Sequence, residues 1–376
     1  RNAPPPNILM IAIDDLNNVV GCMNNPIRAH TPNIDRLAAR GTLFRNAHCP
    51  APICVPARTA VLSGIPPTES GCYVNTRVVS DNAGGAMRSP GLAATLPLSR
   101  HFGDAGYRTL HCGKTYHGSW HSDDQANRPL WSEANQEEWI QAVMRDNRAD
   151  PPGVETVADA NGNPSFSLRW AETGLPDPGV LGDEITTRWC IEKLGESPCE
   201  KPFLLSAGFV RPHTPLFAPP EFFKLYDPNE IIPPKTDTEA FARLSNFART
   251  IALSSGGYGI PGGIRYHLER EDQARAFVYA YLACTSYVDA CIGRLLDALD
   301  ASHHAENTVV ALWADHGWSL GDHHHVQKWA LWRSSTNVPL IVARPGGGPG
   351  VCDVPVSTLD LYPTLAGLCG LPARPE

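Results

Sequence analysis

The apolar run from Asn7 to Ile13 constrains the fold of this chain more than any other feature. A strand that is apolar on both sides is typical of a parallel sheet with helices on each face. Similar strands are predicted at 107–111, 203–207, 308–313 and 338–342. Apolar residues at helical spacing lie between them, most extensively over about 272–300. The alternation predicts an α/β fold with a large central, mostly parallel sheet and helices on both faces.

The charge of the chain narrows the range of its partners. The 376 residues carry a formal net charge of -8. A protein that binds nucleic acid needs a basic stripe, so we expect no nucleic acid partner. No run approaches the roughly 18 apolar residues of a membrane span, so no such span is predicted.

Acidic residues follow two of the predicted strands. Asp14 and Asp15 come directly after the first strand, and Asp315 and His316 come shortly after the strand at 308–313. Active sites of α/β sheets gather at the carboxyl ends of the strands. Adjacent carboxylates repel each other, and a hard divalent cation such as calcium or magnesium would remove that repulsion. Taken alone, such an acidic pair is more often a helix cap or a solvated turn.

A cysteine motif, Cys54-Val55-Pro56-Ala57-Arg58, supports the metal interpretation. A cysteine followed at these offsets by proline and arginine is the pattern that formylglycine-generating enzymes recognise in sulfatases. Together with the acidic segments, the motifs from Asn7 to about Gly370 resemble the type I, formylglycine-dependent sulfatases of the alkaline phosphatase superfamily. Within that family, the chain most resembles the branch with iduronate-2-sulfatase and bacterial polysaccharide sulfatases.

The resemblance implies a metal centre built around a modified cysteine. A maturation enzyme would oxidise Cys54 to formylglycine, and the hydrated aldehyde would bind Ca²⁺, or alternatively Mg²⁺. Arg58 lies one helical turn after Cys54 and would orient the formylglycine or the aspartates. The other metal ligands would be four side chains, Asp14, Asp15, Asp315 and His316.

The same resemblance supplies candidate catalytic and substrate-binding residues. Residues 113–117 resemble the family's glycine-lysine-x-x-histidine segment. By this resemblance, Lys114 would contact the sulfate, and His117 would help to deprotonate a formylglycine hydroxyl. A proline-histidine loop contains Arg211, which would meet a substrate carboxylate or a second sulfate. It also contains His213, a candidate general acid that could be protonated near neutral pH and would also contact the substrate. Lys328 would bind the sulfate and neutralise charge that develops on the transferring group.

The function that follows from the resemblance is hydrolysis of a sulfate ester, expected to be an O-sulfate on a carbohydrate. One hydroxyl of the formylglycine hydrate would attack sulfur, and the other would expel sulfate and regenerate the aldehyde. Two alternatives stay open. One is hydrolysis of phosphonate monoesters or phosphodiesters, as in other members of the superfamily. The other is binding of sulfated glycans without catalysis, if Cys54 is not modified.

The resemblance also predicts a single catalytic domain over 1–376. The stretches at about 118–180 and 210–268 are too long for ordinary connections, so we expect insertions above the edge of the sheet that carries the site, with irregular surface as the alternative. The small C-terminal sheet subdomain of such sulfatases is expected to lie outside this chain. The sequence contains 11 cysteines. With Cys54 set aside, the even remainder permits disulfides, and we expect a periplasmic or secreted location.

Overall fold

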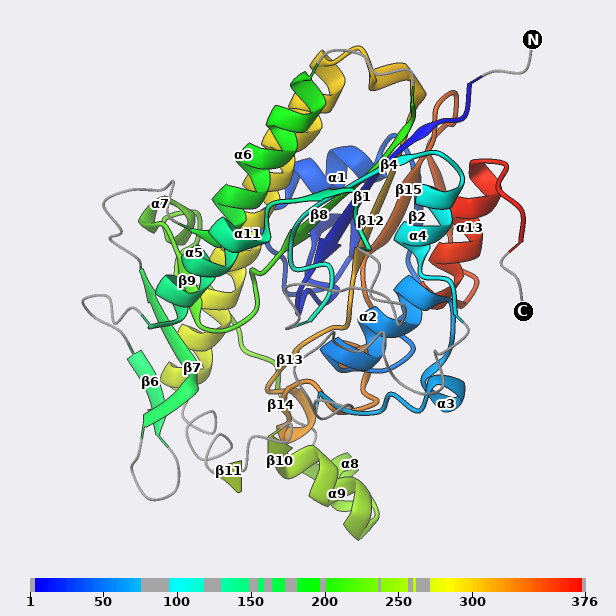
Figure 1. Cartoon of the computed structure of the whole chain (residues 1–376). Coiled ribbons are helices and arrows are strands. Elements are labelled where there is room, and N and C mark those ends of the chain that lie inside the picture. Colours follow the sequence, from blue (N-terminus) through cyan, green and yellow to red (C-terminus); the bar gives the residue numbers. More distant parts are fainter. Residues whose placement is uncertain are drawn as a thin grey trace.

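A computed structural model describes residues 4–75, 95–117, 130–148, 155–158, 164–172, 181–196, 201–235, 238–255, 260–261 and 271–373. An eight-stranded sheet with the order β16-β2-β15-β12-β1-β8-β4-β5 forms its centre (Figure 1). The strands are β16 (Gly350–Cys352), β2 (Thr42–Phe44), β15 (Leu340–Ala343), β12 (Thr308–Ala314), β1 (Asn7–Ile13), β8 (Phe203–Phe209), β4 (Arg108–Gly113) and β5 (Glu133–Ala134). The strands from β12 to β5 run parallel, whereas β15 is antiparallel to both neighbours. The predicted α/β fold with a mostly parallel sheet is confirmed.

Alternate residues of β1 face two helical layers, and all of them are buried. The odd-numbered residues from Leu9 to Ile13 pack with three helices, α1 (Pro32–Ala38), α6 (Gly182–Gly195) and α11 (Glu271–Ala301). The even-numbered residues from Ile8 to Ala12 pack with α2 (Cys54–Ser63), α4 (Leu98–Asp104) and α13 (Leu361–Leu368). Figure 1 shows these layers on opposite sides of the sheet. Burial from both sides explains why the strand is apolar from Ile8 to Ile13.

The longest helix, α11, matches the helix predicted at about 272–300. Among the described residues it is the one helix long and apolar enough to cross a membrane, and 83% of its apolar stretch is buried inside the fold. Such burial is typical of the core helix of a globular domain.

The two predicted insertions are described in part. The first contains α5 (Gln136–Arg148), β6 (Glu155–Ala158) and β7 (Pro164–Glu172). The second contains β9 (Leu216–Ala218), α7 (Pro220–Phe223), α8 (Thr238–Ala242), α9 (Asn246–Leu253), β10 (Ser254–Ser255) and β11 (Ile260–Pro261). β6, β7 and β9 form a small sheet, so the two segments pair with each other. Residues 118–129, 149–154, 159–163 and 173–180 of the first segment, and 236–237, 256–259 and 262–268 of the second, lie outside the described residues.

Short elements complete the described part of the chain. They are β3 (Ala47–His48), α3 (Pro67–Ser70), β13 (Ser319–Leu320), β14 (Val326–Gln327), α12 (Arg333–Thr336) and β17 (Val356–Ser357). The ten described cysteines are all free, and most of them are buried. The disulfides that the cysteine count permits are therefore not found among these ten.

Candidate active site

Four neighbouring strands, β12, β1, β8 and β4, end at the same edge of the sheet. β1 and β12 pair in register over their full length, so Asp14 and Asp315 leave the sheet side by side. Lys114 directly follows β4, and His213 lies in the loop after β8. The parallel order therefore brings together segments that are up to 300 residues apart.

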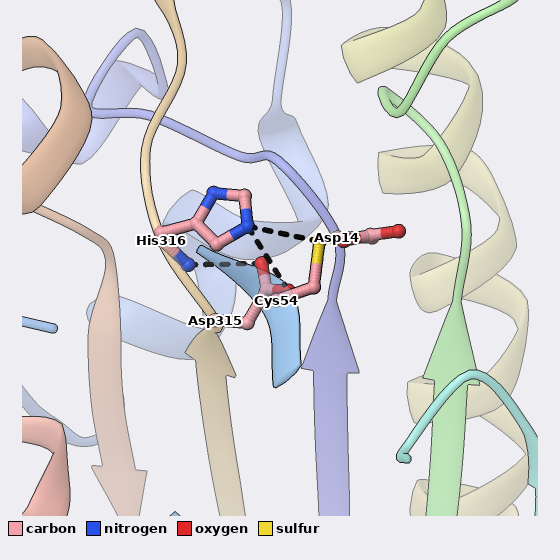
Figure 2. Close-up of side chains that lie close together, drawn as sticks. All are labelled: Asp14, Cys54, Asp315 and His316. Carbon is pink, nitrogen blue, oxygen red and sulfur yellow. Dashed lines mark hydrogen bonds and ion pairs between the residues drawn. The ribbon is translucent and has the colours of Figure 1, made fainter. Parts of the chain in front are cut away.

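Cys54 is the first residue of α2, and its side chain reaches the ends of these strands. Its Sγ is fully buried and lies 2.9 Å from Nζ of Lys328. The same sulfur lies 3.2 Å from Nε2 of His316 and 3.8 Å from Oδ1 of Asp14. Figure 2 shows the His316 ring directed at this sulfur. The modifiable cysteine thus sits at the centre of the predicted ligand set.

Arg58 joins two of the acidic side chains. Its Nε donates a hydrogen bond of 2.8 Å to Oδ2 of Asp315, and its Nη2 lies 3.2 Å from Oδ1 of Asp14. Nη1 donates to the carbonyl of Thr115 at 3.1 Å. The arginine is only 1% exposed. Of its two predicted roles, orienting the aspartates is the one that this geometry supports.

Two lysines complete the charge balance. Lys114 contacts Asp14, and Nζ of Lys328 donates a hydrogen bond of 2.9 Å to Oδ1 of Asp15. Together with Arg58, the two lysines supply three positive charges, which equal the three negative charges of the buried carboxylates. A divalent cation added to this cluster would leave a net positive charge, which suits an anionic ester.

Burial and the neighbouring cations act in opposite directions on the acidic groups. Burial alone would raise the pKa of Asp14, but Lys114 and the other nearby cations hold that pKa well below its usual range. Burial raises the pKa of Asp15 to about 7 against the opposing effect of Lys328. For the thiol of Cys54, the cations outweigh burial, and the pKa lies well below its ordinary value. The cluster thus favours negative charge at residue 54, whereas the cations beside Asp15 do not offset the effect of its burial.

The donors fit a hard divalent cation at this point. Oδ2 of Asp15 is buried and has no hydrogen-bond partner among the residues that the structure describes. Ligand atoms of Asp14, Cys54, Asp315 and His316 lie within 4.8 Å of one another. Carboxylate oxygens are the ligands that Ca²⁺ and Mg²⁺ prefer. The predicted metal ligands are therefore brought together with a chemistry that suits either ion.

The backbone is strained where it presents these groups. Asp15 has a φ of 60°, and Gln327 and Trp329, which flank Lys328, have φ values of 80° and 77°. Residues other than glycine rarely adopt this left-handed conformation. Strain of this kind persists only where the surrounding structure holds it, and it is concentrated at functional sites.

His213 lies at the rim of the cluster, and its side chain is 25% exposed. Its Nδ1 lies 2.6 Å from the carbonyl oxygen of Thr214, so this nitrogen carries a proton and Nε2 faces the site. Nε2 lies 3.8 Å from Oδ2 of Asp15. Burial and then Lys114 lower the pKa of His213 well below its usual value. Protonation near neutral pH, as expected from the sequence, therefore requires an anion to enter beside the ring.

Arg211 is turned away from the cluster. It is only 3% exposed, its Nε donates a hydrogen bond of 2.9 Å to the carbonyl of Phe217, and its Nη1 donates one of 3.0 Å to the carbonyl of His213. This geometry does not support the expected contact with a substrate anion. The guanidinium instead fixes the loop that carries His213.

His117 is the predicted residue whose surroundings are least defined. Its Nδ1 is buried, and within the described residues it has no hydrogen-bond partner. Its role as a proton acceptor stays a prediction.

Sequence reasoning missed one hydroxyl group that supports the site. Tyr281 was counted as an apolar core position, yet its hydroxyl donates a hydrogen bond of 2.6 Å to the carbonyl of Asp15. Trp318 is 2% exposed, and Nζ of Lys328 lies 5.4 Å from the centre of its ring. A tyrosine in a buried helix stripe must find a partner for its hydroxyl, and that requirement is the signal that could have revealed Tyr281.

Comparisons relate the chain to known proteins along nearly all of its length. A family model described as Sulfatase matches residues 6–371. A protein described as a sulfatase from Formosa agariphila is 33% identical over 379 residues, which cover 99% of this chain and 71% of that protein. Iduronate 2-sulfatase from Mus musculus is 29% identical over 98% of this chain and 70% of that protein.

Solved structures give the same relationship at the level of the fold. A 2-O GAG sulfatase superposes with a TM-score of 0.70 at 23% identity, over 99% of this chain and 72% of that chain. A phosphonate monoester hydrolase from Agrobacterium radiobacter superposes with a TM-score of 0.73 at 20% identity, over 98% and 74% of the two chains. At these identities, the likeness concerns the fold alone.

Proposed function

The chain belongs to the sulfatase family and is a sulfuric ester hydrolase, and from that premise we propose that it removes an O-sulfate from a carbohydrate. The proposed nucleophile is a formylglycine made from Cys54, beside a bound Ca²⁺ or Mg²⁺ ion. The observation that carries the proposal is the position of the Cys54 sulfur, which lies 2.9 Å from Nζ of Lys328 and 3.2 Å from Nε2 of His316. A hydroxyl in that position would face a sulfate ester held among cations.

The two groups added to the chain would supply distinct chemistry. The formylglycine hydrate offers two hydroxyls on one carbon, one to attack sulfur and one to expel sulfate. The metal ion offers Lewis acidity and a template for the sulfate oxygens. The residues that would hold the ion are Asp14, Asp15, Asp315 and His316, because their donors converge beside residue 54.

The fixed cations would stabilise charge in the transition state. Lys114 and Lys328 already lie against carboxylates of the cluster, so their side chains need little reorganisation to share their charge with a sulfate group. Arg58 would stay in place and keep Asp14 and Asp315 oriented. The two lysines would therefore act on the transferring sulfate group, and Arg58 would act on the carboxylates that bind the metal.

Two histidines would move protons. His213 would donate a proton from Nε2 to the departing alcohol oxygen, since an incoming anion raises its pKa. His117 would accept the proton of the remaining formylglycine hydroxyl when that group expels sulfate. The overall reaction consumes one ester and one water and yields an alcohol, a sulfate and a proton.

The names of relatives support the choice of a carbohydrate. Iduronate 2-sulfatase and the 2-O GAG sulfatase carry sugar substrates in their names. A choline-sulfatase from Rhizobium meliloti is 26% identical over 97% of this chain, so a small-molecule ester is the contrasting case. Sulfate release from a 2-O-sulfated uronic acid disaccharide should be faster than release from choline sulfate. The reverse order would contradict the carbohydrate assignment.

A mass measurement tests the nucleophile directly. The tryptic peptide that contains Cys54 should be about 18 Da lighter than its thiol form if formylglycine is present. An unmodified thiol in protein purified from its native source would leave binding of sulfated glycans as the better function.

The location of the protein in the periplasm or outside the cell also stays a prediction, which fractionation of the source cells checks.

Phosphonate monoester or phosphodiester hydrolysis is the second candidate reaction, favoured by the fold likeness to a phosphonate monoester hydrolase. A cluster of cations around an oxygen nucleophile would also accept a phosphoryl group. Comparing kcat/KM on an aryl sulfate and on an aryl phosphodiester decides between them. A sulfatase should prefer the sulfate.

A further inference from the structure

A tyrosine hydroxyl from α11 holds the backbone beside the metal-ligand candidates. The hydroxyl of Tyr281 donates a hydrogen bond of 2.6 Å to the carbonyl of Asp15 and accepts one of 3.0 Å from the backbone N–H of Asn17. The side chain is fully buried. One hydroxyl therefore binds both ends of the turn that follows β1.

This turn contains the strained residue of the loop. Asp15 has a φ of 60°, a left-handed conformation that is strained for a residue other than glycine. A conformation of this kind persists only if the contacts around it outweigh its cost. The two bonds of Tyr281 span the strained residue, so they are contacts that can hold it.

Asn17 extends the connection to the second acidic loop. Its side-chain Nδ2 donates a hydrogen bond of 2.7 Å to the carbonyl of Trp318, in the segment after β12. Its Oδ1 accepts a hydrogen bond of 3.1 Å from the N–H of Val19. The loops after β1 and β12, which carry Asp15 and Asp315, are thereby tied to each other and to α11.

We propose that Tyr281 is a positioning residue for the metal centre, because its hydroxyl fixes the turn that presents Asp14 and Asp15 beside Asp315, a role that rests on the metal binding proposed above. Tyr281 would contribute no ligand atom to the metal ion. It acts through the backbone of Asp15 and through Asn17. Metal affinity should therefore depend on this hydroxyl even though it donates no electron pair to the ion.

The alternative is a buried tyrosine whose hydroxyl is satisfied by nearby backbone and contributes only to stability. A matched control separates the two roles. Tyr287 lies on the same helix, is 2% exposed, and has its hydroxyl 3.4 Å from Oε1 of Glu184, outside the cluster. Tyr281→Phe and Tyr287→Phe each remove one buried hydroxyl from α11, and only the first touches the turn.

Calcium binding by the mature protein, measured by isothermal titration, is the first measurement. Loss of a group that orients metal ligands typically weakens affinity by roughly 10–100-fold, and we expect a loss in this range for Tyr281→Phe. Tyr287→Phe should bind Ca²⁺ as the unchanged protein does. If Tyr281→Phe does not fold, Asn17→Ala removes the bond to the Trp318 carbonyl, and it should weaken binding in the same direction.

Hydrogen exchange of the amides at 15–19 is the second measurement, and it does not require the metal. Tyr281→Phe should raise exchange in this segment and Tyr287→Phe should not. Faster exchange with unchanged calcium affinity would show that the turn does not position the ligands and would overturn the inference. If the unchanged protein binds neither Ca²⁺ nor Mg²⁺, the proposed metal role fails, and the positioning role fails with it.

Discussion

Lys328 and Cys54 lie in direct contact, Nζ to Sγ at 2.9 Å, although 274 positions separate them in the sequence. Gln327 and Trp329 on either side of the lysine have left-handed backbone conformations, with φ values of 80° and 77°. The N–H of Trp329 donates to the carbonyl of Pro52 at 3.0 Å, which ties this strained segment to the loop before α2. The lysine is therefore held in place by its own backbone against the start of the helix that carries the cysteine.

Replacement of this lysine should remove the positive charge that stabilises the transferring group and should therefore lower kcat. Lys328→Gln keeps most of the side-chain volume, and kcat for a sulfate ester should fall by about 10²–10³-fold, as for the loss of a single fixed donor at a developing charge. Lys224→Ala removes an exposed lysine outside the site and should leave kcat unchanged. Steady-state kinetics on both variants provide the check. Equal kcat values for Lys328→Gln and Lys224→Ala would contradict the assignment.

Much of the site could be predicted because its geometry follows from sheet topology. Asp14 and Asp315 each stand at the end of an apolar strand, and parallel strands end at one edge. The helix that begins at Cys54 fixes Arg58 one turn away, on the same side. The direction of the strands was enough to place Asp14 beside Asp315, and helical spacing was enough to place Arg58 beside Cys54. Only the resemblance to sulfatases joined these two pairs into one site.

Other features depend on packing that no local pattern encodes. Arg211 stands in a polar loop like a ligand-binding arginine, and only its bonds to the carbonyls of Phe217 and His213 show that it faces inward. Tyr281 has the spacing of a core residue, and only the fold brings its hydroxyl to Asp15. The partnership of β7 with β9 joins two segments that looked like separate insertions. Such contacts are long-range, so spacing along the sequence does not reveal them.

The proposed mechanism requires both hydroxyls of the formylglycine hydrate, so substitutions of Cys54 should abolish turnover. Cys54→Ser retains one hydroxyl and has no second hydroxyl to expel sulfate, so multiple turnover should be lost. Cys54→Ala should also be inactive, with folding and metal binding largely retained. Cys284→Ala, which changes a buried cysteine in the middle of α11, should keep full activity. Sulfate release with time measures all three, and sustained turnover by either Cys54 variant would contradict the proposed nucleophile.

Removal of divalent cations should abolish activity and lower thermal stability. Within the described part of the chain, one buried carboxylate oxygen of Asp15 has no hydrogen-bond partner, and a bound cation would satisfy it. A ligand present at 100 times its Kd stabilises the folded state by about 2.7 kcal/mol, so Ca²⁺ should raise the Tm of chelator-treated protein measurably. Activity should return with Ca²⁺ or Mg²⁺. Full activity after exhaustive chelation, with no metal detected by elemental analysis, would exclude the metal role.

The pH dependence of stability can be tested at a carboxylate outside the active site. Asp289 on α11 accepts hydrogen bonds from the backbone N–H groups of Asn33 and Ile34 at 3.2 and 2.8 Å, at the start of α1. Burial raises the pKa of Asp289 to about 6, against the effect of these bonds. In the unfolded chain, the pKa of an aspartate is about 4. Between these values the folded state binds more protons, so the contribution of this group to stability falls as pH rises from about 4 to 6.

Comparison with Asp289→Asn isolates this group from the other acids. The free energy of unfolding of the unchanged protein minus that of the variant should fall by of the order of 2 kcal/mol between about pH 4 and 6, and stay constant above. Urea unfolding at several pH values gives the difference. A difference that rises with pH would mean that the folded state instead lowers the pKa of Asp289.

The buried arginine of the site should matter far more to stability than an exposed arginine with equally good geometry. Arg58 lies 2.8 and 3.2 Å from oxygens of Asp315 and Asp14, and all three side chains are at most 1% exposed. Arg45 lies 2.8 Å from Asp353, with side chains 38% and 67% exposed. Removal of one partner from a buried pair typically costs about 3–5 kcal/mol, whereas an exposed pair contributes about 1 kcal/mol or less. Urea unfolding of metal-free Arg58→Leu and Arg45→Leu should show this difference.

The same pair of variants separates the electrostatic cause from simple loss of packing. In Arg58→Leu, two buried carboxylates lack their shared cation, and a divalent ion bound beside them would replace part of that charge. Saturating Ca²⁺ should therefore recover a larger part of the lost stability in Arg58→Leu than in Arg45→Leu, whose partner is exposed to water. If Ca²⁺ stabilises both variants equally, the cost at residue 58 comes from lost packing, and the arginine is not what balances the acidic ligands.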